Sequence, residues 1–193
     1  MSKKTALTIA ALIAAQALMY LAWRVVESGR SPSPDLAPTG QTRGAAEVLT
    51  TRLNTTLPDL QIRRADGATA TLREALSAGE GSGDAPRIVH VWATWCPPCR
   101  EELPGLFAYG DTGEVSVLAV SVDPGWEDVR ALLGEEPRDE VALASGERVR
   151  DALGVRALPV TFVVDEGGTI RLRLDGARDW ADPELRAEVA AVR

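Results

Sequence analysis

Two cysteines separated by two prolines place the tightest constraint on how this chain can fold. Cys96 and Cys99 lie in the stretch R-I-V-H-V-W-A-T-W-C-P-P-C-R-E-E-L-P of residues 87–104 and are the only 2 cysteines among 193 residues. Residues 88–92 are β-branched, apolar or aromatic, which is typical of a buried strand. Proline is tolerated in a helix only in the first turn. The pattern therefore predicts a strand, a turn and a helix, with Cys96 at the helix N-cap.

This arrangement favours redox chemistry. A thiolate at an N-cap can accept hydrogen bonds from unpaired amides and lies at the positive end of the helix dipole, which lowers its pKa. Cys96 is therefore the expected nucleophile, and Cys99 can resolve a mixed disulfide on Cys96 by forming the Cys96–Cys99 bond. A structural zinc site needs about four ligands, whereas this chain has 2 Cys and 1 His. An inert disulfide across so short a loop contributes little chain-entropy stabilisation. We expect neither a metal nor a cofactor.

The motif W-A-T-W-C-P-P-C-R-E-E-L-P resembles the active site of the thioredoxin superfamily, in particular that of the membrane-anchored TlpA, ResA and CcmG-like thiol-disulfide oxidoreductases. The resemblance extends to Pro104, where thioredoxin-like proteins kink the active-site helix, and to L-P-V-T-F-V-V-D at residues 158–165, which is similar to the loop with the family's cis-proline. It covers residues 57–192. It implies an α/β thioredoxin-like fold: a central mixed β-sheet flanked by helices, with an N-terminal β-hairpin and a central insertion.

The resemblance also implies roles for residues near the cysteines. A cis Pro159 would pack against the cysteine pair and leave the backbone of Leu158 free to pair with an extended substrate segment. The alternative is an ordinary trans proline at the start of a strand. Three further residues flank the cysteines and are candidates for substrate contact: Trp95, Pro97 and Pro98.

Glu102 and His90 are candidate proton-transfer residues. Glu102 follows Cys99 by three residues and so shares its helix face; in ResA and CcmG-like proteins a glutamate at this offset is thought to help move protons. A partly buried carboxylate with a raised pKa can take the proton from Cys99, whereas the alternative is a solvated glutamate.

His90 departs from the family, because the TlpA-like group more often has Asn six residues before the first cysteine. Strand alternation puts its ring on the same side as Trp92 and Thr94, beneath the cysteines. There it is either a proton relay that titrates near neutral pH or a hydrogen-bonded core histidine.

The N-terminus predicts a membrane anchor. Residues 5–23 form a run of 19 uncharged residues after Lys3 and Lys4, long enough to span a bilayer with the lysines in the cytoplasm. A cleaved signal peptide is the competing interpretation, because residues 15–17 read A-Q-A; the apolar run continues to residue 23 and favours an uncleaved anchor. The predicted organisation is a cytoplasmic stub at residues 1–4, an anchor at 5–26, a flexible linker at 27–55 and a thioredoxin-like domain at 56–193.

Other elements follow from local patterns. We expect a hairpin from residues 60–63 and 69–72 around the turn at 65–67, and a short helix before the domain at residues 43–54. Further elements are expected as helical turns at 73–78, strands at 115–122, 141–144, 161–165 and 170–174, and helices at 127–133, 147–153 and 183–192. Gly154 should end the helix at 147–153, and Asp182 should cap the last one.

The function that these observations predict is a monomeric, membrane-tethered thiol-disulfide reductase at the bacterial inner membrane, facing the periplasm or extracytoplasmic space, where disulfides persist. The two prolines remove amide donors from the Cys96 thiolate, which favours a reducing pair. The resemblance implies substrate protein disulfides, such as apocytochrome c or the copper site of an oxidase, and a DsbD or CcdA-type transmembrane thiol donor.

Other functions fit less well or stay open. After Val26 the net charge is −10, because all 28 acidic but only 18 of 21 basic residues follow it; this argues against nucleic-acid binding. A disulfide-introducing oxidase would use the same residues with the opposite redox poise, and a copper-binding chaperone would use the cysteines as ligands. Peroxiredoxins have the pattern P-x-x-x-T-x-x-C, whereas here Val89 and Ala93 occupy the Pro and Thr places.

Overall fold

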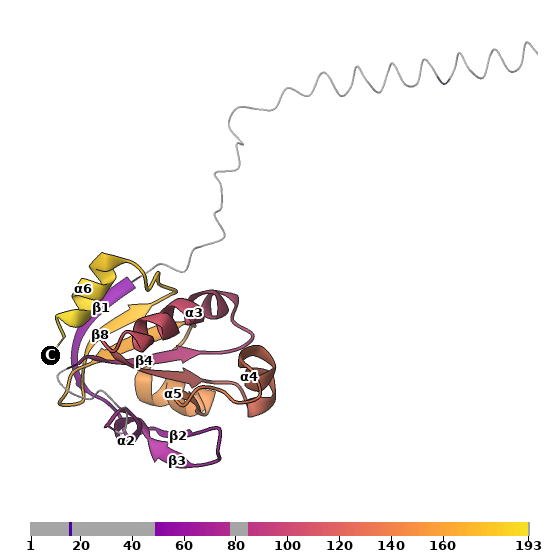
Figure 1. Ribbon diagram of the computed structural model, residues 1–193, viewed down its shortest axis with the longest axis horizontal. Coiled ribbons are helices and arrows are strands. Elements are labelled where there is room, and N and C mark those ends of the chain that lie inside the picture. Colours follow the sequence, from indigo (N-terminus) through magenta and orange to yellow (C-terminus); the bar gives the residue numbers. More distant parts are fainter. Residues whose placement is uncertain (1–15, 17–48, 78–84, 193) are drawn as a thin grey trace, which may run out of the picture. The chain divides into compact units, whose positions relative to one another are not determined.

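The structure, a computed structural model, describes residues 16, 49–77 and 85–192. Residues 49–77 and 85–192 form an eight-stranded mixed sheet in the order β1-β8-β7-β4-β5-β6-β2-β3 (Figure 1). The strands are β1 Leu49–Thr56, β2 Gln61–Arg63, β3 Thr69–Thr71, β4 Arg87–Trp92, β5 Ser116–Ser121, β6 Val141–Leu143, β7 Val160–Val164 and β8 Thr169–Asp175. The helices are α2 Leu72–Ser77, α3 Pro97–Asp111, α4 Trp126–Leu133, α5 Gly146–Leu153 and α6 Pro183–Ala190.

Strand β4 lies at the centre of the sheet and leads into the cysteine motif. It pairs in parallel with β5 and antiparallel with β7, and all six of its residues are buried. Side chains of a strand point alternately to the two faces of its sheet, so Ile88 and Trp92 join one core cluster while Val89 and Val91 join the other. His90 alternates with Ile88 and Trp92 and therefore faces the first cluster.

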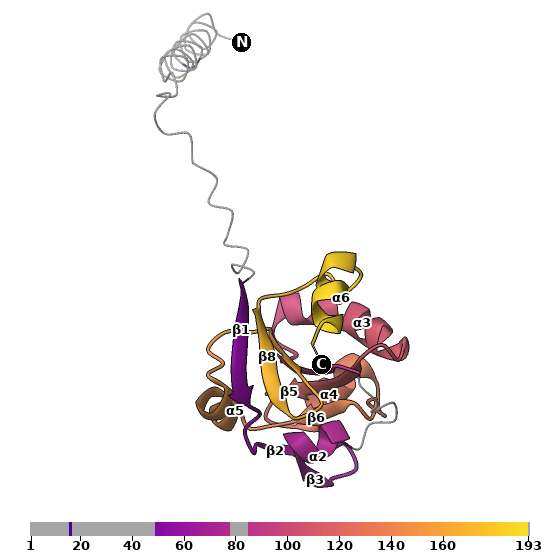
Figure 2. The ribbon, with the colours of Figure 1, turned by 90° about the vertical axis from the view of Figure 1, so that its left-hand side faces the viewer.

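Helices cover both faces of the sheet. Figures 1 and 2 show α3 and α6 together on one face and α5 on the other. The first cluster contains Leu103 and Leu106 of α3, Val129 of α4 and Val189 of α6. The second contains residues of α2 and α5, including Leu72, Leu76, Val149 and Leu153. The cysteine motif thus starts a helix that packs on a fully buried strand.

The N-terminal hairpin and the insertion are confirmed. Strands β2 and β3 pair antiparallel from Gln61↔Thr71 to Arg63↔Thr69. Between β5 and β7 the chain adds α4, β6 and α5, and Arg63 pairs with Leu143 to join the hairpin to the sheet through β6. At the C-terminal helix, the Asp182 carboxylate accepts the Glu184 N–H at 2.9 Å, as an N-cap should.

The predicted helix at residues 43–54 is wrong where the structure describes it, because residues 49–56 form β1. This strand runs antiparallel to β8 from Leu49↔Asp175 to Thr56↔Thr169, with an irregularity between Arg52 and Thr55. Four of its eight residues are threonine, whose β-branched side chain favours strands. Residues 49–55, which were predicted as part of the linker, are therefore part of the sheet.

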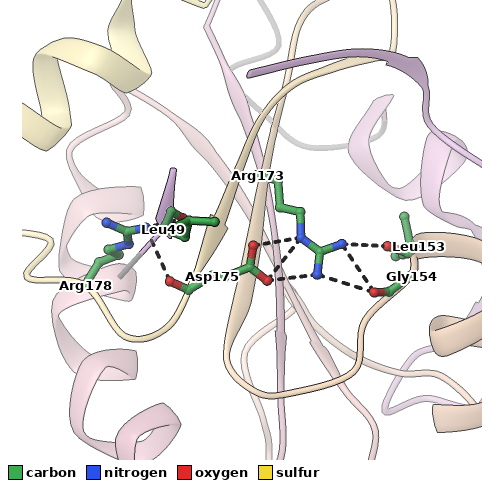
Figure 3. Close-up of polar contacts among 6 residues, drawn as sticks. All are labelled: Leu49, Leu153, Gly154, Arg173, Asp175 and Arg178. Atoms are coloured by element: carbon green, nitrogen blue, oxygen red, sulfur yellow. Dashed lines mark hydrogen bonds and ion pairs between the residues drawn. The ribbon is translucent and has the colours of Figure 1, made fainter. Parts of the chain in front are cut away.

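Two arginines tie β1 and β8 to the rest of the domain (Figure 3). The guanidinium of Arg173 donates to the Asp175 carboxylate and to the carbonyls of Leu153 and Gly154 at the end of α5. Gly154 has φ +64°, the left-handed conformation expected of a glycine that ends a helix. The guanidinium of Arg178 donates to the carbonyl of Leu49 at 2.8 Å, so the start of β1 is held beside the segment after β8.

The predicted membrane segment at residues 5–23 lies, apart from Gln16, outside the described residues. Within the described parts of the chain, no helix combines the length and apolar character that crossing a bilayer requires.

Candidate active site

The cysteine motif adopts the predicted order of strand, turn and helix. After β4, the Cys96 N–H donates to the Ala93 carbonyl at 3.2 Å and closes a tight turn. Cys96 has the extended backbone of an N-cap, with φ −98° and ψ 103°, and Pro97 and Pro98 form the first two positions of α3. Neither proline has an N–H. The first amide hydrogen that α3 can offer to the Cys96 sulfur is therefore that of Cys99.

Cys96 and Cys99 form a disulfide with an S–S distance of 2.05 Å. Cys96 retains 5% of its surface and Cys99 none, so Cys96 is the half of the pair that solvent reaches. Trp95 precedes the pair with 66% of its surface exposed, and Pro97 and Pro98 are exposed as well. Exposed apolar side chains therefore precede and follow Cys96 in the chain.

Asp123 holds the turn before Cys96 and was not found from the sequence. Its buried carboxylate accepts the Thr94 N–H at 2.9 Å, the Thr94 hydroxyl at 2.8 Å and the Ser121 hydroxyl at 2.6 Å. The contact links the end of β5 to the turn that positions the cysteine pair. An aspartate two residues beyond a buried strand carries no signal that identifies such a partner.

Glu102 is buried on the inner side of α3, and the solvated alternative is wrong. One carboxylate oxygen, Oε2, accepts the Arg178 backbone N–H at 2.8 Å and the Trp180 indole N–H at 3.1 Å. Burial raises the pKa of Glu102 from 4.5 to about 7, although these two hydrogen bonds act in the opposite direction. Arg178 and Trp180, from the segment between β8 and α6, are thus further site residues that sequence reasoning missed.

The ring of His90 lies between β7 and Glu102. Its Nδ1 is 2.9 Å from the Thr161 hydroxyl, and its Nε2 is 3.6 Å from Oε1 of Glu102. Burial lowers the pKa of His90 to about 3. Of the two alternatives for His90, the hydrogen-bonded core histidine therefore fits better than a relay that titrates near neutral pH, and the neighbouring group whose pKa lies near neutrality is Glu102.

Pro159 and Leu158 lie at the same end of the sheet as the cysteine motif. The Leu158–Pro159 peptide bond is cis, as the resemblance implied. Val160, the next residue, pairs with Val91 near the end of β4, and Leu158 packs against the core cluster that contains both cysteines. The Pro159 carbonyl accepts the Gly176 N–H at 3.0 Å, which ties this loop to the segment that carries Arg178.

A shallow hollow of about 300 Å³ opens beside the start of α3. It is lined by Pro98, Glu101, Glu102 and Gly105 on the helix and by residues 177–180 on the facing segment. Glu101, unlike Glu102, is exposed. Among the described residues, no three His, Cys, Asp or Glu side chains are grouped so that they can hold a metal ion. The chemistry that the site offers is therefore exchange at a disulfide with a buried proton donor or acceptor nearby.

Comparisons with known proteins agree with this geometry. A DsbE homolog from Paracoccus denitrificans is 34% identical over 113 residues, covering 54% of this chain and 62% of that protein. HelX of Rhodobacter capsulatus, a thiol:disulfide interchange protein, is 32% identical over 92 residues, covering 47% of this chain and 52% of HelX. The ResA oxidoreductase of Oceanobacillus iheyensis is 30% identical over 136 residues, covering 65% of this chain and 66% of that protein. The chain spans about half the length of the first curated relatives it matches.

Solved structures share the fold. A thioredoxin-like protein from Porphyromonas gingivalis has a TM-score of 0.53 at 29% identity, covering 70% of this chain and 92% of that one. A DsbE-type protein from Chlorobium tepidum has a TM-score of 0.55 at 24% identity, covering 72% of this chain and 97% of that one. The thioredoxin-like fold is thereby confirmed. The model of the AhpC/TSA family matches residues 53–173, more than half of the chain and both cysteines, so the chain belongs to the AhpC/TSA family.

Proposed function

We propose that this protein is a thiol-disulfide oxidoreductase that works as a reductase. The observation that carries the proposal is the disulfide at the N-cap of α3, in which Cys96 is slightly exposed and Cys99 is fully buried, with a buried carboxyl, Glu102, on the same helix. The names of the relatives, which describe thiol:disulfide interchange, support the same reaction class.

In the reduced protein, the Cys96 thiolate attacks one sulfur of a substrate disulfide. The new Cys96–substrate bond forms as the substrate S–S bond breaks, and the first substrate sulfur leaves as a thiolate. Cys99 then loses its proton and attacks Cys96, which forms the Cys96–Cys99 bond and releases the second substrate sulfur. The substrate gains two electrons, and the protein loses two.

Glu102 is the proposed proton carrier for the second step. Cys99 and Glu102 are three residues apart on α3 and project from one helix face. As a carboxylate, Glu102 takes the Cys99 proton and then passes it to the departing thiolate or to solvent. A group with a pKa of about 7 suits this role near neutral pH, because it gains and loses a proton with similar ease.

The first turn of α3 supports the proposed reductase direction. Pro97 and Pro98 supply no N–H to a Cys96 thiolate, so the thiolate is stabilised less than at an N-cap with a full set of donors. A less stabilised thiolate makes the reduced form a better electron donor. A disulfide-introducing oxidase would instead need a strongly stabilised Cys96 thiolate.

The substrate is proposed to be an extended polypeptide segment that carries a disulfide. It would lie across exposed Trp95 and Pro98 and pair with the half-buried loop at Leu158. The expected setting is extracytoplasmic, tethered by residues 5–26, with a transmembrane thiol donor of the DsbD or CcdA type. The expected substrates are apocytochrome c or the copper site of an oxidase.

Trapping tests the proposal. In the full-length chain, Cys99→Ala should accumulate mixed disulfides between Cys96 and substrate proteins, because the resolving thiol is missing. Cys96→Ala is the matched control and should trap none. Equal trapping by the two variants, or trapping by Cys96→Ala alone, would overturn the assigned roles. A reduction potential near that of a strong periplasmic oxidant would overturn the reductase direction.

A further inference from the structure

Two buried polar atoms face each other between β4 and α3. The His90 Nε2 and the Glu102 Oε1 are 3.6 Å apart, and their side chains are 0% and 3% exposed. Neither atom has another hydrogen-bond partner among the described residues. The separation is a few tenths of an ångström longer than a hydrogen bond. Buried polar atoms rarely stay unpaired, so each is the natural partner of the other.

The second ring nitrogen of His90, Nδ1, has a partner that can either donate or accept a hydrogen bond. Nδ1 is 2.9 Å from the buried Thr161 hydroxyl, and a hydroxyl can donate or accept a hydrogen bond. His90 and Thr161 are register partners in the β4–β7 ladder. The sheet therefore fixes the ring in place between Thr161 and Glu102.

The ring is neutral near pH 7, because burial lowers the pKa of His90 to about 3. The charged or titratable groups that face Glu102 are His90 from β4 and Arg178 from the segment after β8. A neutral imidazole has one N–H and one acceptor nitrogen, and either nitrogen can hold the proton.

We propose that His90 is a positioning residue for Glu102, and that its ring changes tautomer with the protonation state of that carboxyl. When Glu102 is protonated, Oε1–H donates to Nε2, and Nδ1–H donates to the Thr161 hydroxyl. When Glu102 is ionised, Nε2–H donates to Oε1, and the Thr161 hydroxyl donates to Nδ1. Both ring nitrogens of His90 and the Oε1 atom of Glu102 thus have a partner in both states. The inference rests on the proposed role of Glu102 as proton carrier.

The proton count is balanced. Between the two states Glu102 loses one proton, to the departing thiolate or to solvent. The imidazole carries one proton in both end states, on Nδ1 in the first and on Nε2 in the second, and the Thr161 hydroxyl hydrogen rotates between them. His90 is thus neutral in both end states, whereas a proton relay that titrates near neutral pH would populate the imidazolium.

The only histidine of the chain makes this directly measurable. Long-range ¹H–¹⁵N NMR of the full-length, disulfide-bonded protein should show the Nδ1–H tautomer at pH 5 and the Nε2–H tautomer at pH 9. In Glu102→Gln the side-chain amide donates to Nε2 at every pH, so the ring should stay in the Nδ1–H form. A single tautomer across this range in the parent, a switch retained in Glu102→Gln, or an imidazolium at neutral pH would overturn the proposal.

Because the disulfide stays closed, the NMR result does not depend on catalysis. A negative NMR result therefore leaves the trapping test of the proposed function intact.

A second experiment uses two variants of residue 90. Asn at residue 90 can reach the position of Nδ1 but not that of Nε2, whereas Gln can reach the position of Nε2. The pH profile for reduction of glutathione disulfide by the reduced chain should move upward by about one pH unit in His90→Asn, because an ionised Glu102 loses its donor.

His90→Gln should remain closer to the parent profile. A merely structural role would lower the rate or the stability of both variants without moving the midpoint. Identical midpoints in the parent and both variants would therefore also overturn the proposal.

Discussion

Replacing Glu102 with Gln isolates the cost of burying an ionisable carboxyl. The amide oxygen of Gln can accept the hydrogen bonds from the Arg178 N–H and the Trp180 indole that the Oε2 atom now accepts. Its NH₂ group can face His90 Nε2 in place of Oε1. The substitution therefore keeps the shape and the contacts of the side chain and removes only its ability to ionise.

The magnitude follows from the pKa of Glu102, which burial raises from 4.5 to about 7. A folded-state pKa above the unfolded value means that the folded protein binds the proton more tightly. The free energy of unfolding then falls as the pH rises from about 4.5 to about 7 and stays reduced above that range. A difference of about 2.5 in pKa corresponds to about 3 kcal/mol.

Urea denaturation of the disulfide-bonded chain at a series of pH values from 4 to 9, followed by tryptophan fluorescence, measures this effect. Glu102→Gln should match the parent at pH 4 and exceed its free energy of unfolding by about 3 kcal/mol at pH 8. Glu101→Gln removes the same charge from the exposed neighbour and should differ from the parent by no more than about 0.5 kcal/mol. Parallel curves for the parent and Glu102→Gln would refute the reasoning.

Three further substitutions test other parts of the site. Pro98→Ala restores an amide donor in the first turn of α3, which should stabilise the Cys96 thiolate by about 1.4 kcal/mol and raise the reduction potential by roughly 30 mV. Equilibration with glutathione measures this potential. An unchanged or lower potential would contradict the proposed reductase direction. Trp95→Ala should slow reduction of peptide disulfides but change the free energy of unfolding by no more than about 0.5 kcal/mol, since Trp95 is 66% exposed; an unaltered rate would remove Trp95 from the substrate site. Asp123→Ala should lower the free energy of unfolding by about 2–3 kcal/mol in urea denaturation, because it leaves the two Thr94 donors unpaired; parent-like stability would show that the turn does not need this carboxylate.

Local rules were sufficient for much of the site. The cysteines, the N-cap position of Cys96 and the placement of Pro97 and Pro98 in the first helical turn all follow from what a strand, a proline and a helix terminus allow. The same holds for the buried central strand, the hairpin at residues 61–71 and the cap at Asp182. The shared helix face of Cys99 and Glu102 follows from helical periodicity alone.

The remaining features depend on contacts between residues distant in the sequence. Strand β1 pairs with β8, more than 110 residues further along the chain, and a threonine-rich segment of this length shows no partner by itself. The hydrogen bonds of Glu102 come from Arg178 and Trp180, and the contacts of His90 come from Thr161 and Glu102. The pKa values of both groups are shifted chiefly by desolvation.

The sequence by itself therefore determined which atoms carry the redox chemistry, because a cysteine at a helix N-cap is specified by its immediate neighbours. The tertiary structure decided which group near the cysteines can exchange a proton at neutral pH. Desolvation depends on everything packed around a side chain. Here it shifts the pKa values of His90 on β4 and of Glu102 on α3. It makes Glu102, and not His90, the residue that titrates near neutrality.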